Sequence, residues 1–556
     1  MKKFYYLIWG FAVLFFSNPT FATHQMGADM EYSCLGKFGN AMRYKVTFSF
    51  YRNCRDGGST SASAPTTVSL SAIPQACAGV GNVTATMVQI PGKSGVEVSP
   101  LCPNQISQSG CNYSGSGNSP YPGVQVYKYE ATIDLPLTCT NWKFQTTDCC
   151  RNGAINNIPN PGSTSLSIEA YVNQGTDPLT GQPYCNSSVT FTQLPVPFVC
   201  INNITNYNHG AVDADGDSLV YTLINPLGDS YNPIGFNGGY SVSQPVRTNP
   251  SGTFKIDAAT GQMTFMPGFI EADVLAVRVD EYRNGVLIGS TIRDIQVNVL
   301  TCNVSIPQPE PITSVVNGNQ KDSITLQVCP GTQVSFDIKV IDPNGRNLTL
   351  SSSLQGNPSP LPGANFTQVN VGSAPNDTAI ARVTWLPAPG DTGCHQFLLI
   401  AENDDCPVKG RAAKVYNVCV FNKVQLLTAS PTYCGTPVQL TASGGTNFTW
   451  NPTTGLSSST ILNPTASPSV PTMYKFTSDC GTDSVYVNVA APFVFDAGTG
   501  GQICQNGQIQ LNASVDNKYA PYKIKWTPAT GLEDPIYGLA NDSILNPMAS
   551  PLTTTK

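Results

Sequence analysis

The feature that most constrains this chain is its cysteine content behind an export signal. The 556-residue sequence contains 18 cysteines, a number typical of disulfide-bonded proteins of oxidising compartments. Two lysines precede an apolar run over residues 4–16, and Thr20 and Ala22 are the small residues that a signal peptidase reads. We therefore expect residues 1–22 to be a signal peptide and the mature chain to be secreted and located at the cell surface.

Two alternatives to this interpretation are weaker. The apolar run is shorter than the roughly 20 residues that a helix needs to cross a bilayer, and no later stretch is apolar and long enough, so no transmembrane segment is expected. Structural zinc competes with disulfides, but the chain has only 3 histidines and no paired C-x-x-C ladder. Cys149 and Cys150 are adjacent, and we expect them to bond different partners because a bridge between neighbours closes a strained ring.

Composition and residue pattern both indicate β-structure. Charged residues make up 12% of the chain, about half of the roughly 25% in ordinary soluble domains. Alternating apolar and polar residues over 44–51, 124–135 and 166–172 predict strands, and no stretch has a helical period. The formal net charge of -6 provides no basic surface for nucleic acid. The sequence predicts an all-β protein that does not bind nucleic acid.

After the signal peptide the pattern predicts five domains. Residues 23–197 form a Cys-rich β N-terminal domain. Residues 198–301 and 302–422 each follow the order strand, acidic turn, strand, hairpin and closing strand, which is typical of a β-sandwich. Residues 423–490 and 491–556 form two shorter immunoglobulin-like or PKD-like repeats, of which the second is truncated. The expected architecture is therefore a series of tandem β-sandwiches.

The last two domains contain an internal repeat. Trp-x-Pro-x-Thr-Gly-Leu begins at Trp450 and again at Trp526, and Ile-Leu-Asn-Pro-x-Ala-Ser-Pro follows in both copies. We interpret these tryptophans as core residues in preference to a carbohydrate-stacking surface. Cys434 precedes the first copy and Cys480 follows it, an order that predicts a Cys434–Cys480 disulfide within an immunoglobulin-like sandwich. The second copy stops at Lys556, before its closing strands, so we expect the sequence to be a fragment of a longer protein.

An acidic turn in the domain at 198–301 is the best candidate for a ligand site. Carboxylates at alternate positions can converge on one hard cation, and Ca²⁺ takes six to eight oxygen ligands. The turn resembles the Asp-x-Asp element of cadherin-type repeats, and a later acidic pair stands where those repeats have another. The possible calcium ligands are Asp213, Asp215, Asp217, Asp280 and Glu281. A plain polar β-turn is the competing interpretation, because Asp and Gly are common in turns.

The domain at 302–422 offers a weaker copy of this pattern. Gly345 and Arg346 replace two of the residues on the ligand side of the turn. The resemblance makes residues 198–301 a cadherin-like sandwich and residues 302–422 a second cadherin-like or immunoglobulin-like one. The residues of the weaker copy are Asp342, Asn344, Glu402, Asp404 and Asp405. Apart from calcium, we expect no cofactor.

Enzyme signatures are not found in the sequence. It contains no G-x-S-x-G, no H-E-x-x-H and no phosphate-binding glycine loop. His24, His209 and His395 are the three histidines available as general bases, and each is more typical of a packed or solvated side chain. Any two of 35 acidic residues might form the carboxylate pair of a glycosidase, but no segment singles out such a pair. We predict no catalytic residue and no enzymatic activity.

The start of the mature chain carries a family resemblance. Residues 23–34 (THQMGADMEYSC), followed by residues 44–52 and Cys54, resemble the start of large secreted surface proteins of Bacteroidetes bacteria. The acidic-turn modules and the tryptophan repeats are similar to modules of these proteins, which usually carry immunoglobulin-like or PKD-like repeats. They often end in a gliding-motility-associated sorting domain read by the type IX secretion system. No such domain is present in this sequence.

This resemblance implies one of two functions. The first is a secreted surface adhesin or structural protein, with a link to gliding motility or surface attachment, that binds an unknown surface glycan or protein. The second is the non-catalytic N-terminal part of a large secreted hydrolase that degrades polysaccharide or protein. The residues themselves do not identify the partner.

Overall fold

The structure is a computed structural model in which the chain forms two compact units, residues 1–420 and 421–556. The predicted signal peptide lies outside the described residues. None of the described helices has both the length and the apolar character to cross a membrane. The structure describes residues 24–56, 59–60, 64–178, 181–249, 252–356, 359–371, 377–490, 495–504, 506–515, 523–527, 530, 532–533 and 543–550.

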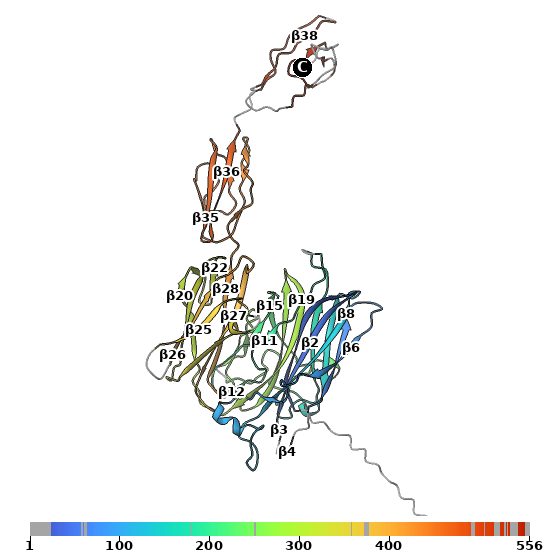
Figure 1. The fold of residues 1–556 in the computed structure, drawn as a ribbon, viewed down its shortest axis with the longest axis vertical. Helices are drawn as coiled ribbons and strands as arrows, with labels where there is room; N and C mark the ends of the chain where they lie inside the picture. Colours follow the sequence, from blue (N-terminus) through green and yellow to red (C-terminus); the bar gives the residue numbers. More distant parts are fainter. Residues whose placement is uncertain are drawn as a thin grey trace, which may run out of the picture. The chain divides into compact units, whose positions relative to one another are not determined.

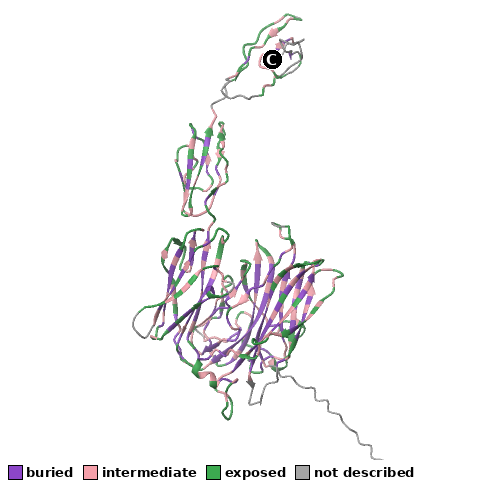
Figure 2. Ribbon diagram, viewed as in Figure 1, coloured by how far each residue is buried: buried purple, intermediate pink, exposed green. Residues whose placement is uncertain are grey.

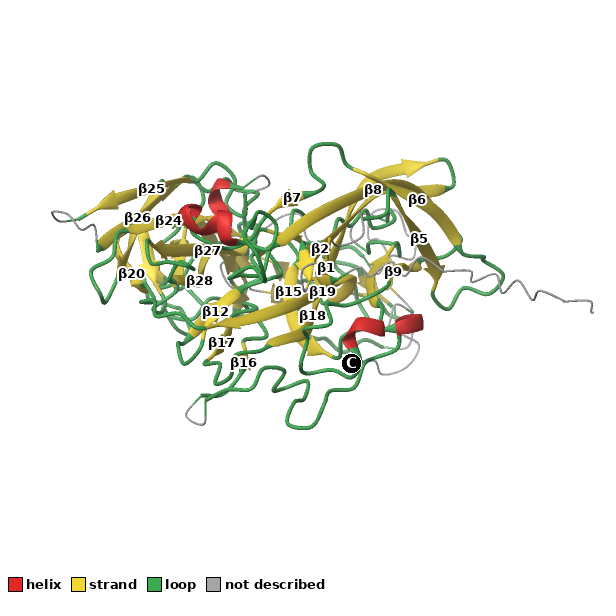
Figure 3. Ribbon diagram, turned by 90° about the horizontal axis from the view of Figure 1, so that it is seen from below, coloured by secondary structure: helices red, strands yellow, loops and turns green. Residues whose placement is uncertain are grey.

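The predicted all-β fold class is confirmed. Strands and loops account for nearly all of the described chain, and the helical parts are short 3-10 turns such as Pro103–Gln108 (Figure 3). Apolar and polar residues alternate along the strands, and turn residues are frequent between them. The sequence therefore contains no segment with the period of an amphipathic helix.

The largest sheet winds around the first hydrophobic core. Its strand order is β1-β2-β8-β6-β5-β9-β10-β19-β18-β15, and β1 also pairs with β19. In this order, the first strand, β1, and the seventh, β10, both bond to β19. The sheet therefore encloses a shared interior (Figure 1). The bounds are β1 Gln25–Phe38, β2 Ala41–Asn53, β5 Thr67–Pro74, β6 Val83–Gln89, β8 Val124–Pro136, β9 Asn141–Asp148, β10 Leu166–Asn173, β15 Ser218–Ile224, β18 Ala272–Arg283 and β19 Val286–Leu300.

Alternation along β2 explains why its residues form this sheet. Tyr44, Val46 and Phe48 are buried in the interior. Lys45 lies on the outer face and pairs with Glu130 of β8 at 2.8 Å. Successive side chains of a strand point to opposite faces, so one face supplies the core and the other is solvated, as the buried and exposed stripes of Figure 2 show.

The hairpin formed by β18 and β19 is buried on both of its faces. Ala276 and Ile292 belong to the first core, whereas Leu275 and Val297 belong to a second core. The Asn284-Gly285 turn has positive φ at both residues, 52° and 79°, the geometry that joins strands in a tight hairpin. Residues on the two sides of position 197 thus contribute to one sheet, which differs from the expected separation of residues 23–197 and 198–301. The physical reason is that a strand apolar on both faces needs a layer on each side.

The strands from Gln308 to Val420 form a two-sheet sandwich. One sheet has the order β20-β23-β26-β25 and the other contains β21, β22, β28, β27 and β24. Trp385 is 2% exposed in the core between them, and its Nε1 donates to the carbonyl oxygen of Pro362 at 2.9 Å. The bounds are β20 Gln308–Val316, β21 Gly318–Gln320, β22 Thr325–Val328, β23 Val334–Ile341, β24 Leu348–Ser352, β25 Asn365–Asn370, β26 Thr378–Trp385, β27 Gly393–Asn403 and β28 Arg411–Val420.

Three short strands connect this sandwich with the hairpin. Strand β13 pairs with β17 and touches β28 through Asn206 and Ala412. Together with β16 it covers the second core on the side away from β18 and β19. The bounds are β13 Thr205–Tyr207, β16 Lys255–Ile256 and β17 Met263–Phe265. The described residues up to 420 are therefore continuous through shared sheets.

Disulfides clamp segments that are distant in the sequence, which confirms the interpretation of most cysteines. The longest loop is closed by Cys102–Cys406, with a sequence separation of 304. Cys149 and Cys150 bond each other, so the expectation of different partners is wrong. A cross-link over a long loop removes much of the freedom of the unfolded chain. The other bridges within residues 1–420 are Cys34–Cys185, Cys54–Cys111, Cys77–Cys139, Cys200–Cys302 and Cys394–Cys419.

The second unit contains the tryptophan repeats. Trp450 is 1% exposed and donates to the carbonyl oxygen of Ile461 at 3.1 Å. Trp526 makes the equivalent bond to Ile544 at 2.9 Å, so the sequence repeat is also a structural one. The strands used below are β30 Thr432–Tyr433, β33 Thr449–Asn451, β35 Thr472–Ser478 and β36 Gly481–Val489.

The predicted Cys434–Cys480 disulfide does not form, because Cys434 is a free, exposed thiol. Tyr433 pairs with Val489 at the end of β36, whereas Cys480 directly precedes the start of that strand. Eight residues of extended strand span about 26 Å, and a disulfide requires Cα atoms within about 7 Å. The Cys–Trp–Cys order therefore places its two cysteines at opposite ends of the sandwich.

We predict that Cys434 and Cys504, both free and exposed, react with a maleimide on the unreduced protein. Peptide mass spectrometry should also detect Cys102 cross-linked to Cys406. Cys434→Ser should remove one label without changing the thermal unfolding curve, because no bridge is lost. Recovery of a Cys434–Cys480 peptide from unreduced protein would contradict the structure.

Candidate functional site

The acidic turn lies between β14, Ala211–Val212, and β15. Asp213 Oδ1 accepts hydrogen bonds from the backbone N–H groups of Asp215 and Asp217 at 3.0 and 2.8 Å. Gly216 has a φ of 81°, a conformation in which glycine has no steric cost. The turn therefore folds locally around the first aspartate, as its composition indicates.

Tertiary packing brings one distant residue to this turn. One oxygen each of Asp213, Asp217 and Glu281 lie within 4.8 Å of one another, and we call these three residues the acidic cluster. Glu281, on β18, is fully buried and accepts from Asn186 Nδ2 at 2.6 Å. Asp213 Oδ2 is buried and has no hydrogen-bond partner. The cluster thus contains an unsatisfied acceptor.

The other two predicted ligands lie elsewhere. Asp280 pairs with Arg278, two residues before it on β18, at 2.9 Å. It lies on the opposite face of the strand from Glu281, since neighbours in a strand alternate. Asp215 accepts from the backbone N–H of Ser187 at 2.8 Å and is not in the cluster.

Arg283 is the residue that sequence analysis missed at this site. Its guanidinium binds both oxygens of Asp217, at 2.7 and 2.8 Å, and reaches Asp215 at 3.4 Å. The hydrogen bonds to Asp217 raise the pKa of Arg283. The sequence signal that could have identified Arg283 is its place two residues after Glu281 on the same strand. One cation therefore balances part of the negative charge of the cluster.

Burial controls the protonation of the cluster. Burial, followed by the charge of Asp213, raises the pKa of Glu281 to about 8. Burial, with the charges of Asp217 and Asp215, raises the pKa of Asp213 to about 7. A carboxylate held in such a place is stabilised by a proton or by a cation.

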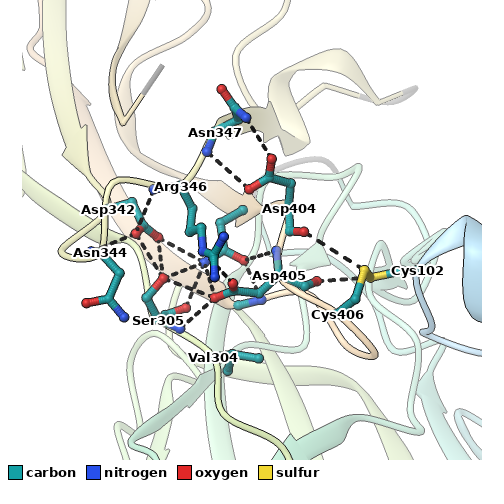
Figure 4. A network of polar contacts seen from close by, with 12 residues as sticks. Cys102, Val304, Ser305, Asp342, Asn344, Arg346, Asn347, Asp404, Asp405 and Cys406 are labelled. Atoms are coloured by element: carbon teal, nitrogen blue, oxygen red, sulfur yellow. Dashed lines mark hydrogen bonds and ion pairs between the residues drawn. A yellow bond between two sulfur atoms is a disulfide. The ribbon is translucent and has the colours of Figure 1, made fainter. Parts of the chain in front are cut away.

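The weaker acidic pattern forms a different kind of site, a closed polar network (Figure 4). Ser305 Oγ donates to Asp342, and the Ser305 backbone N–H donates to Asp405 at 2.7 Å. Asn403 Nδ2 lies within hydrogen-bond distance of both carboxylates. Arg346 Nε pairs with Asp405 at 2.7 Å. Because both buried aspartates have partners, this network is complete without a cation.

The remaining residues of the weaker pattern surround this network. Asn344 and Arg346 donate their backbone N–H groups to Asp342. Asp404 accepts from Asn347, and Glu402 pairs with Lys409 at 3.0 Å. The pattern therefore organises a structural junction.

Two histidines are packed in aromatic surroundings. His209 is fully buried and lies between the rings of Tyr207 and Tyr221. Burial lowers its pKa well below the usual value, and neither ring nitrogen has a hydrogen-bond partner. His395 packs edge-on against Trp385. These surroundings are those of core side chains.

A pair of carboxyl groups, separate from the acidic cluster, lies at the start of β18. Glu271 pairs with Arg247 and accepts from the hydroxyl of Tyr240 at 2.9 Å. Asp273 is fully buried beside Glu271, and burial, then the hydrogen bond and charge of Glu271, raises its pKa to about 9. Asp273 therefore keeps its proton at neutral pH, whereas the hydrogen bond from Arg247 lowers the pKa of Glu271.

Comparison with known proteins adds only distant similarity. No family model and no curated protein matches the chain. The ICAM-5 D1–D4 ectodomain fragment is 9% identical, with a TM-score of 0.19, over 83% of this chain and 100% of that one. The full ectodomain of mouse nectin-like molecule 4 is 13% identical, with a TM-score of 0.18, over 53% and 97%. Human CDH23 EC21-23 is 13% identical, with a TM-score of 0.16, over 53% and 98%.

These neighbours are tandem immunoglobulin-like and cadherin ectodomain repeats. Likenesses at such TM-scores carry no conclusion about activity or partners. The described residues themselves define the class, an all-β, disulfide-bonded protein of sandwich modules.

We predict that Asp273→Asn changes the pH dependence of stability. The folded chain keeps the Asp273 proton up to about pH 9. The unfolded chain releases the same proton at about pH 3.9. Unfolding between these values releases a proton, so the free energy of unfolding falls as pH rises towards 9. The Asn variant lacks this loss, and its stability relative to wild type should rise by up to ~1.4 kcal/mol per pH unit.

Urea unfolding at about pH 6 and about pH 8 measures this difference. Glu130→Gln, on the outer face of the first sheet, is the matched control and should show no such trend. A stability difference between Asp273→Asn and wild type that is independent of pH would count against the raised pKa of Asp273.

Proposed function

We propose that this chain is an exported cell-surface adhesin or structural binding protein. The observation that carries the proposal is the covalent clamping of segments far apart in sequence, above all Cys102–Cys406, in an all-β chain. Such bridges persist only in oxidising compartments, and stable modules with solvated outer faces suit the presentation of binding loops.

The export route and the biological role that we propose rest on the sequence. The mature start resembles surface proteins of Bacteroidetes bacteria, and this resemblance supports export by the type IX system and a link to gliding motility or surface attachment. The tryptophan repeats fit a spacer that holds a binding region away from the cell. The partner would be a surface glycan or protein.

We also propose that the acidic cluster binds Ca²⁺. Oxygens that bind one calcium ion lie at most about 5 Å apart, and the three carboxylate oxygens of the cluster lie within 4.8 Å of one another. The unpartnered Asp213 Oδ2 would become a ligand, with Glu281 and Asp217 supplying further oxygens. The ion would compete with Arg283 for Asp217. The completed network at Asp342 offers no comparable oxygen.

Attachment tests the first proposal. Cells that lack this protein should adhere less to their native surface than the parent strain, and expression of the full protein should restore adhesion. Protease treatment of intact cells should remove the protein, because it is exposed outside. Normal adhesion of the deletion strain, or protection of the protein from protease in intact cells, would contradict the proposal.

Thermal unfolding tests the second proposal. Calcium at about 100 times its Kd should stabilise the full chain by ~2.7 kcal/mol relative to chelator. Asp213→Asn and Glu281→Gln should abolish this gain, because each removes a charged ligand. Asp280→Asn, outside the cluster, should keep it. An equal transition in calcium and chelator for the wild type would overturn the assignment.

A further inference from the structure

A cavity of about 210 Å³ lies where four segments of the first unit meet. Its apolar wall includes Pro100, Leu101, Phe198 and Val408. Its polar lining comes from different strands and loops, and includes Asn203, Asn206, Glu402, Lys409 and Arg411. The cavity is separate from the acidic cluster and from the carboxyl pair.

The walls of this cavity are rigidly held. Val304 lines the cavity, whereas its neighbour Ser305 belongs to the polar network of Figure 4. In the same way Glu402 lines the cavity and Asn403 joins the network. Two disulfides also support the cavity: Cys102, which follows Leu101, bonds Cys406, and Cys200, itself a lining residue, bonds Cys302. A site held in this way is organised before a ligand arrives.

The charged part of the lining has an excess of positive charge. Lys409 Nζ lies 3.0 Å from Glu402 Oε2, and Arg411 Nε lies 3.5 Å from Glu402 Oε1. Two cations therefore share one carboxylate. Arg411 Nε is buried and makes no hydrogen bond. A ligand with one negative charge would balance this group.

The uncharged part of the lining offers both a donor and an acceptor. Asn203 Nδ2 donates to the carbonyl oxygen of Val304 at 2.7 Å, which leaves the Asn203 carbonyl oxygen for another partner. Asn206 Oδ1 accepts from Thr264 Oγ1 at 2.9 Å, which leaves its amino group. Hydroxyl groups, which donate and accept at once, match this pair.

We propose that the cavity binds one acidic sugar unit, a hydroxylated ring that carries a carboxylate. The carboxylate would meet Lys409 and Arg411, the ring hydroxyls would meet Asn203 and Asn206, and the C–H face of the ring would pack on Leu101. Drug-sized ligands occupy roughly 300–1,000 Å³, so this smaller cavity suits a single ring. The carboxyl end of a peptide would use only the cations and leave the two amides unmatched.

This inference names a ligand class for the proposed attachment role and rests on it for its biological meaning. It is tested on purified full chain by saturation-transfer NMR and calorimetry, with D-glucuronate, D-glucose and acetate as separate probes. Failure here would leave the cell-adhesion result intact, so the two proposals are distinguishable. D-glucuronate should bind. D-glucose and acetate should each bind with an affinity at least about tenfold lower, because each lacks one set of contacts.

The Lys409→Gln/Arg411→Gln variant should lose about tenfold or more in affinity for D-glucuronate. Asn206→Ala, which leaves the ion pairs intact, should weaken binding of the sugar without affecting that of acetate. Lys143→Gln is the matched control, because Lys143 pairs with Glu169 on the first sheet, and it should bind as wild type does. Absence of D-glucuronate binding, equal binding of acetate, or full binding by the double variant would each overturn the assignment.

Discussion

The hairpin of β18 and β19 belongs to two hydrophobic cores, and the first unit depends on this shared use. One face completes the interior enclosed by strands β1 to β10, and the other face forms the second core with β13, β16 and β17. Asp294 of β19 is buried with Arg151 at 2.8 Å. Removing one member of such a pair leaves an uncompensated buried charge, which lowers the stability of the fold by about 3–5 kcal/mol. The hairpin therefore links the N-terminal region to its neighbour both by apolar packing and by charge.

The two acidic turns show how small differences in partners change the chemistry of similar sequences. At Asp342 and Asp405 a serine, an asparagine and an arginine satisfy the carboxylates, and the result is a structural junction. At Asp213 one carboxylate oxygen stays without a partner beside a fully buried glutamate. The first arrangement stabilises the fold, whereas the second leaves a buried acceptor that the proposed calcium ion would use. The junction has a further consequence, since it also supports the wall of the proposed sugar cavity.

The disulfides act at the same places as these polar groups. Cys102–Cys406 ends beside the network at Asp405, and Cys200–Cys302 lies at the start of the segment that carries Ser305. Covalent closure of long loops limits the unfolded chain, while the network fixes the local geometry in the folded one. A protein of low charge content gains stability from this combination without a dense surface of ion pairs.

Local sequence determined the strands, the turns and the cysteine chemistry of this protein. Alternation along residues 44–51 predicted β2, the Trp-x-Pro repeat predicted equivalent modules, and spacing at residues 213–217 predicted an acidic turn. These features depend on interactions between neighbours, and a sequence shows them directly. Only the tertiary structure decided that β18 and β19 serve two cores, that Glu281 but not Asp280 joins the turn, and that Cys434 and Cys480 lie at opposite ends of a sandwich. Those outcomes depend on strand pairing over long separations, where a shift of one residue exchanges the two faces.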